Sequence, residues 1–153
     1  MTSRSRIEDP YELLRFVDAQ LTVYPQVIEE LSAGRKRSHW MWFVFPQLVG
    51  LGFSAMAQRF AIGSRAEAEA YLAHEILGPR LIECTRLIMA ASDKSINDIL
   101  GSPDDIKLRS SLTLFDAVSG DSVFRSALDK FCAGASDSAT LAILEKPLEG
   151  PRT

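Results

Sequence analysis

Two groups of residues combine the types and the spacing that chemistry on a small molecule requires. The first lies in RKRSHWMWFVFPQ, residues 35–47, which holds both tryptophans of the chain and one of its two histidines. An indole beside an imidazole can stack a flat ligand, and a lysine or arginine can bind its anionic part. The candidate ligand-binding residues in this stretch are Lys36, Arg37, Ser38, Trp42 and Gln47, with His39 as a candidate catalytic residue.

The second group lies in SPDDIKLRSSLTLF, residues 102–115. Asp104, Lys107 and Ser111 are spaced i, i+3 and i+7, so they share one face if the stretch is helical. A carboxylate beside an ammonium and a hydroxyl can hold a polar substrate or transfer a proton. We take Lys107 and Ser111 as candidate ligand-binding residues, and Asp104 and Asp105 as candidate catalytic residues beside His39.

Together the two groups predict one cleft between an aromatic segment (39–47) and a polar helix (104–113). A flat ring between Trp42 and His39, with an anion near Lys36 or Arg37, suits a nucleotide-like or ADP-ribose-like small molecule. The sequence is compatible with binding alone and with a hydrolase-like or glycosidase-like enzyme that uses acid–base chemistry.

Both groups also have a purely structural interpretation. Aromatic side chains are most often buried, and Trp40, Phe43 and Phe45 favour a core role. Two acidic residues in a first helical turn stabilise any helix through its dipole. The alternative is therefore a non-enzymatic interaction or structural module in which the aromatic segment lies entirely in the core.

Other kinds of site have no support in the sequence. His39 and His74 are far apart, and neither has a further ligand at helical spacing, so we expect no metal site. There is no glycine-rich phosphate loop and no nucleophile elbow, and we expect no cofactor. Cys84 and Cys132 lie in apolar helical patterns, which is typical of free thiols.

Composition and charge exclude two classes of partner. The formal charge of the 153 residues is −3, which gives no field that attracts nucleic acid or an anionic membrane. No apolar run approaches the ~20 residues of a membrane span, and no signal-peptide core follows the opening MTSRSR. We expect a cytoplasmic protein, a monomer or weak homodimer, with no nucleic-acid or membrane partner.

Helix signals recur along nearly the whole chain and predict a compact all-α domain of about seven to eight helices without a substantial sheet. The expected starts are Asp9–Pro10 (with Glu12), Pro25, Ser38, Ser64, Ile76, Ser95, Ser102, Asp121, and Ser136 or Asp137. Ser38 and Pro46 would bound a short buried helix on which His39 and Trp42 share a face. We expect one domain over 1–153, with its core at about 9–146, a last helix that Pro147 ends, and short flexible termini.

Three strings carry a resemblance to a known family: GRKRSHWMWFVFPQLVGLG, AEAYLAHEILGPRLIE and SPDDIKLRSSLTLF. Over residues 11–145 the sequence resembles the bacterial domain of unknown function 1810, which implies a compact all-α fold and no established activity. Some members are labelled calpastatin, but this capped and periodic chain does not resemble that inhibitor's disordered repeats. A fainter similarity to the YbiA-like proteins implies N-glycosidic or ADP-ribose-type substrates and assigns no residue.

Overall fold

The computed structural model describes residues 9–91 and 93–145, and over these residues the chain is all-α, as predicted. The helices are α2 (Leu14–Leu21), α3 (Tyr24–Ser32), α4 (Met41–Val44), α5 (Ala55–Arg59), α6 (Arg65–Ala73), α7 (Leu77–Ala90), α8 (Ile96–Leu100), α9 (Asp104–Val118), α10 (Val123–Cys132) and α11 (Ser138–Leu144). An isolated parallel bridge between Leu48 and Ile62 is the one β-type pairing among the described residues. The predicted terminator Pro147 and the terminal segments lie outside the described residues.

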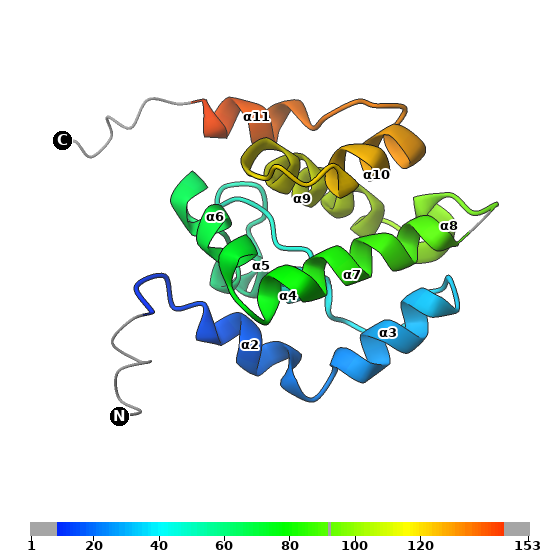
Figure 1. Cartoon of the computed structure of the whole chain (residues 1–153), viewed down its shortest axis with the longest axis horizontal. Coiled ribbons are helices and arrows are strands. Elements are labelled where there is room, and N and C mark those ends of the chain that lie inside the picture. The colour runs from blue at the N-terminus through cyan, green and yellow to red at the C-terminus, as the bar shows by residue number, and fades with distance from the viewer. Residues whose placement is uncertain (1–8, 92, 146–153) are drawn as a thin grey trace.

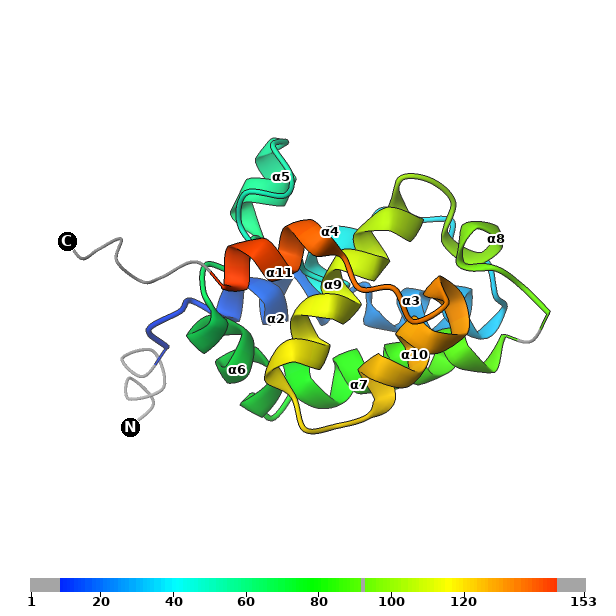
Figure 2. The ribbon, with the colours of Figure 1, turned by 90° about the horizontal axis from the view of Figure 1, so that it is seen from above.

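The two longest helices, α7 and α9, form the centre of the molecule. α3 and α6 pack on α7, α11 packs on α9, and α10 packs on both (Figure 1). The view from above shows that α5 projects from the rest of the helices (Figure 2). None of the helices in the described part of the chain is long and apolar enough to cross a membrane.

A chain of aromatic rings crosses the core from α2 to α10. The ring centroid of Phe16 lies 5.1 Å from that of Tyr71, which lies 5.4 Å from that of Phe115, and Phe115 lies 6.0 Å from Phe124. All four side chains are fully buried. Edge-to-face and tilted ring pairs of this kind add to the apolar area that they bury, so these rings join four helices into one core.

The first turn of α7 requires a glycine where it meets the end of α6. A Cβ atom at Gly78 would lie 2.0 Å from the carbonyl oxygen of Leu72, which is closer than any real contact. The backbones of the two helices therefore approach each other at a distance that no side chain allows.

Three predicted caps are confirmed. The side chains of Ser64, Ser95 and Asp137 accept hydrogen bonds from the third following N–H group, and Ser95 forms a reciprocal capping box with Asp98. Each cap satisfies a donor that the first turn of a helix leaves free.

The predicted start of the first helix is wrong. α2 begins at Leu14, because the Asp9 carboxylate accepts from the N–H groups of Leu13 (2.7 Å) and Leu14 (3.0 Å) across an intervening turn. Glu12 lies in that turn with a positive φ of 53° and does not return to cap Asp9.

Two predicted serine caps are also wrong. Ser38 does not start a helix, since α4 begins only at Met41. The hydroxyl of Ser102 lies 3.1 Å from an oxygen of Asp105 and accepts from Asn97, so it does not cap the backbone of α9. α9 itself begins near the predicted residue and ends at Val118, as expected.

Candidate functional site

One buried carboxylate fixes the segment that leads into α4. Glu30, on α3, accepts hydrogen bonds from five donors. These are the N–H groups of Arg37 (2.8 Å) and Ser38 (3.0 Å), the Ser38 hydroxyl (2.5 Å), the Trp40 indole (2.9 Å) and the Gln26 amide (2.8 Å). Burial raises the pKa of Glu30, but the hydrogen bonds outweigh burial and lower it to about 2. Glu30 is therefore ionised and orders the segment around itself.

Sequence reasoning missed Glu30, although the sequence contains a signal for it. Glu30 follows Val27 by three residues and precedes Leu31, so it lies on the apolar face of α3. A carboxylate at such a position must find donors inside the fold. The basic and polar segment that follows α3 supplies them.

The Glu30 network explains why His39 and Trp42 do not share a helical face, contrary to the prediction. The Ser38 hydroxyl bonds Glu30 instead of capping a helix, and residues 35–40 stay non-helical. Trp40 turns inward and is buried, whereas His39 is exposed and Trp42, on α4, is partly buried.

Asp104 brings the two predicted groups together. Its carboxylate lies 2.7 Å from the ammonium of Lys36 and 3.8 Å from that of Lys107. The Lys36 ammonium also lies 5.0 Å from the ring centroid of Trp40, and the Lys107 ammonium 5.6 Å from that of Trp42. Two cations thus lie over two indoles with one carboxylate between them, and the contact of Lys36 with this carboxylate is the closer of the two.

A bridge between two loops positions the last member of the aromatic group, Gln47. The carbonyl of Gln47 accepts from the N–H of Ile62 (2.8 Å), and the N–H of Val49 donates to the carbonyl of Ile62 (2.9 Å). Gln47 is held there beside α9, and it lines one cavity with Trp42 and Lys107.

The cavity that Trp42, Gln47 and Lys107 line between the two groups is far smaller than the predicted ligand-sized cleft. The cavity lined by Trp42, Gln47 and Lys107 has a volume of about 10 Å³. That volume holds about one water molecule, whereas small-molecule sites take ~300–1,000 Å³. The side chain of Lys107 lies over the indole and fills the space that a stacked ring would need.

The other predicted site residues lie outside this cluster or are buried. Asp105 faces α8: it accepts from Asn97 and Ser102, and these bonds outweigh burial and lower its pKa. Ser111 is fully buried, and its hydroxyl has no hydrogen-bond partner among the described residues. Arg37 is exposed.

Neither metal nor thiol chemistry has a site in the described part of the chain. No three His, Cys, Asp or Glu side chains lie close enough there to hold a metal ion. Cys84 and Cys132 are free, and burial raises the pKa of both, to about 12 for Cys84. Both thiols are therefore protonated near neutral pH and are poor nucleophiles.

The chain matches the family model described as "Protein of unknown function (DUF1810)" over residues 10–144. It is also similar to a solved structure, that of the conserved hypothetical protein Rv1873 from Mycobacterium tuberculosis. The sequences are 53% identical, the match covers 91% of this chain and 100% of that one, and the TM-score is 0.90. No curated protein is significantly similar to the sequence. The chain therefore belongs to the DUF1810 family of all-α proteins.

Proposed function

We propose that the protein binds a nucleotide-like or ADP-ribose-like small molecule where the segment 36–47 meets α9. The observation that carries this proposal is the position of Lys107. Its ammonium covers the partly exposed indole of Trp42 and lies 3.8 Å from Asp104, which is a loose contact for an ion pair. A long, flexible lysine held this weakly can exchange its place with a ligand at small cost.

Ligand entry follows from displacement of Lys107. When its side chain swings outward, a planar ring takes its place over Trp42 and stacks on the indole. The Gln47 amide, which lines the same cavity, then meets polar atoms at the edge of the ring. The displaced ammonium of Lys107 stays on the ligand side and pairs with a phosphate.

Lys36 and Glu30 supply the rigid part of the site. Lys36 keeps its 2.7 Å pair with Asp104 in the bound state, and Glu30 holds the backbone of residues 37 and 38. A segment that is already ordered loses little conformational entropy when a ligand binds. Turnover would add roles for His39 and Asp104 as proton carriers, and binding requires neither of them.

A thermal-shift screen tests the proposal. The panel contains AMP, ADP, nicotinamide dinucleotide, ADP-ribose and sugar phosphates. At about 100 times Kd a specific ligand adds about 2.7 kcal/mol to the stability of the folded state. The stabilisation should fall in Trp42→Phe and Lys107→Met, and it should persist in Lys130→Met, which removes an exposed lysine on α10. The absence of any stabilising ligand, or equal stabilisation in all variants, contradicts the proposal.

Self-association is a second candidate function, and the projecting α5 region favours it. Phe53, directly before this region, is 81% exposed, and Val49 is 50% exposed. Exposed apolar side chains on a projecting element are typical of contact sites, here with a second copy of the chain. Sedimentation analysis should then show a concentration-dependent dimer that Phe53→Ser removes. A strictly monomeric protein at high concentration excludes this function.

A further inference from the structure

A second hollow runs along the outer face of α7, and none of its lining residues belongs to the site proposed above. Its volume is about 910 Å³, which is within the range of small-molecule sites. The floor follows one stripe of α7, since Gly78, Ile82, Arg86 and Ala90 are four residues apart. Pro79, Glu83 and Leu87 lie beside this stripe, and Leu72 and Asp121 complete the lining.

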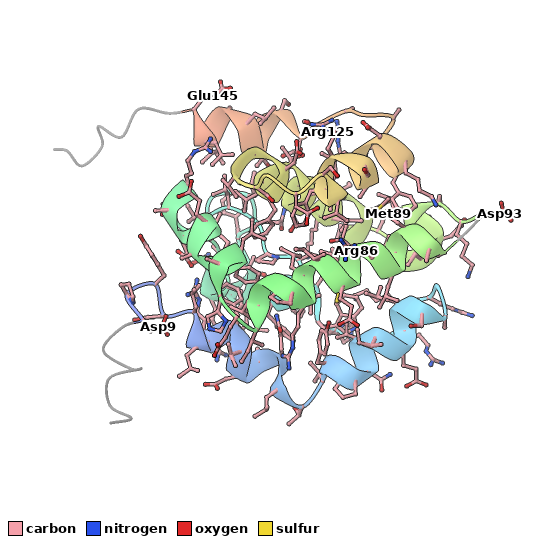
Figure 3. The ribbon with its side chains drawn as sticks, viewed as in Figure 1. Asp9, Arg86, Met89, Asp93, Arg125 and Glu145 are labelled. Carbon is pink, nitrogen blue, oxygen red and sulfur yellow. The ribbon has the colours of Figure 1, made fainter. Side chains whose placement is uncertain are left out.

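Only one of the three charged side chains in this groove is without a partner. The hydroxyl of Tyr24 donates to Glu83 (2.6 Å), and the carboxylate of Asp121 accepts from the N–H of Val123 (2.9 Å). Arg86 is exposed, and among the described residues its guanidinium makes no hydrogen bond and no ion pair. Figure 3 shows Arg86 between α7 and α10 in that view. Within the described part of the chain, Arg86 is therefore the one charged group of the groove whose hydrogen-bonding capacity is wholly unused.

Apart from Glu83 and Asp121, the rest of the lining is apolar and lies mainly on one side of Arg86. Ile82, Pro79 and Leu72 extend from Arg86 toward the start of α7, and the rise of an α-helix places Gly78 ~12 Å from Arg86 along the axis. Arg86 has Leu87 and Ala90 on its other side. A guanidinium beside a longer run of apolar side chains complements a molecule with an anionic head and an extended apolar body.

We propose that this groove binds an elongated apolar carboxylate. The carboxylate pairs with the Arg86 guanidinium in the two-bond geometry that these groups favour, and the tail covers Ile82, Pro79 and Leu72. The tail removes partly exposed apolar side chains from water, which drives binding, while Arg86 selects for the negative charge. This site does not include Trp42 or Lys107, so its test is independent of the test of the function proposed above.

Chemical-shift mapping of the amide groups of the ¹⁵N-labelled protein tests the proposal, with decanoate as the probe and decanol as its uncharged match. Decanoate should shift the amide signals of residues 78–90 and of Asp121, and it should bind more tightly than decanol. Arg86→Gln should weaken decanoate binding about tenfold or more, because a charge-assisted hydrogen bond contributes ~1.5–3 kcal/mol. The same variant should leave decanol binding unchanged.

Three controls keep the result specific to the groove. Arg35→Gln removes an exposed arginine outside the groove and should not change decanoate binding. Arg86→Glu should abolish the preference for decanoate and create one for decyltrimethylammonium, and Trp42→Phe should have no effect. The proposal is overturned if decanoate and decanol bind equally, if Arg86→Gln binds decanoate as the wild type does, or if the shifted signals lie elsewhere.

Discussion

The carboxylate of Asp104 lies 2.7 Å from the ammonium of Lys36, so a single ion pair joins the segment before α4 to the first turn of α9. The Lys36 side chain is only 8% exposed, and its backbone N–H donates to the carbonyl of Ile99 at 2.7 Å. Lys36 therefore connects three parts of the chain. The relative placement of the two predicted groups of residues depends on this contact.

Removal of the Asp104 charge should destabilise the fold. In Asp104→Asn the nearly buried ammonium of Lys36 loses its counter-charge, which should cost ~1.5–3 kcal/mol in the free energy of unfolding. Urea denaturation measures this cost. A double-mutant cycle with Lys36→Met separates the pair from the individual side chains, and additive costs in that cycle would contradict a direct interaction.

Glu30 should make stability dependent on acid. Its pKa is about 2 in the folded protein, below the ordinary value of 4.5 that applies in the unfolded chain. A lowered pKa contributes stability that is fully present above about pH 4.5 and is lost as the pH falls toward 2. At about 1.4 kcal/mol per pKa unit, the contribution is ~3 kcal/mol.

Glu30→Gln is the matching variant. Its amide NH₂ group is a hydrogen-bond donor and would face the N–H and O–H groups that donate to the Glu30 carboxylate. We expect it to lower the free energy of unfolding at neutral pH by ~2–4 kcal/mol and to flatten the loss of stability between about pH 4.5 and pH 2. Glu29→Gln is the control, since Glu29 is exposed on the same helix. Equal acid sensitivity in wild type and Glu30→Gln would show that other carboxylates cause the loss.

The two tryptophans should differ in their contribution to stability. Trp40 is 1% exposed and donates its indole N–H to Glu30, so Trp40→Ala should cost ~3–5 kcal/mol. Trp42 is partly exposed, and Trp42→Ala should cost less, ~1–2 kcal/mol. Equal unfolding midpoints for the two variants in guanidinium would contradict the burial that distinguishes them.

Ser95, before α8, and Ser102, before α9, should also differ in their contribution to stability. Ser95 caps α8 reciprocally with Asp98, so Ser95→Ala should cost ~0.5–2 kcal/mol. The Ser102 hydroxyl is exposed and bonds only the side chains of Asn97 and Asp105, so Ser102→Ala should change stability by less than ~0.5 kcal/mol. Thermal unfolding of both variants checks the order, and a larger cost for Ser102→Ala would restore the capping role predicted from the sequence.

Local signals in the sequence predict most of the helices. The caps at Ser64, Ser95 and Asp137 act within three residues, so the sequence around them contains all the information that their contacts need. Ser38 has the same local signal but does not cap, because the Glu30 carboxylate, on another helix, bonds its hydroxyl instead. Competition of this kind depends on the tertiary fold, which a local pattern does not contain.

The sequence predicts which side chains of the two groups meet better than it predicts the space between them. Asp104 and Lys107 share a helical face, as their spacing indicates, and they meet Lys36 and Trp42. The closed space between the two groups depends on how α4 packs beside α9, and on the lysine side chain that covers the indole. Neither follows from periodicity, because the distance between two helices is set by the side chains of both.

Fluorine NMR of the protein labelled with 5-fluorotryptophan reports whether a ligand stacks on Trp42, because the chain contains two tryptophans and gives two signals. Trp42→Phe assigns the signal of Trp42. During a titration with ADP-ribose, we expect the Trp42 signal to shift and saturate as the ligand replaces Lys107, while the signal of the buried Trp40 stays in place. A Trp42 signal that does not move, at a concentration where calorimetry shows ADP-ribose to be bound, would contradict ligand binding over Trp42, and so would the absence of any binding.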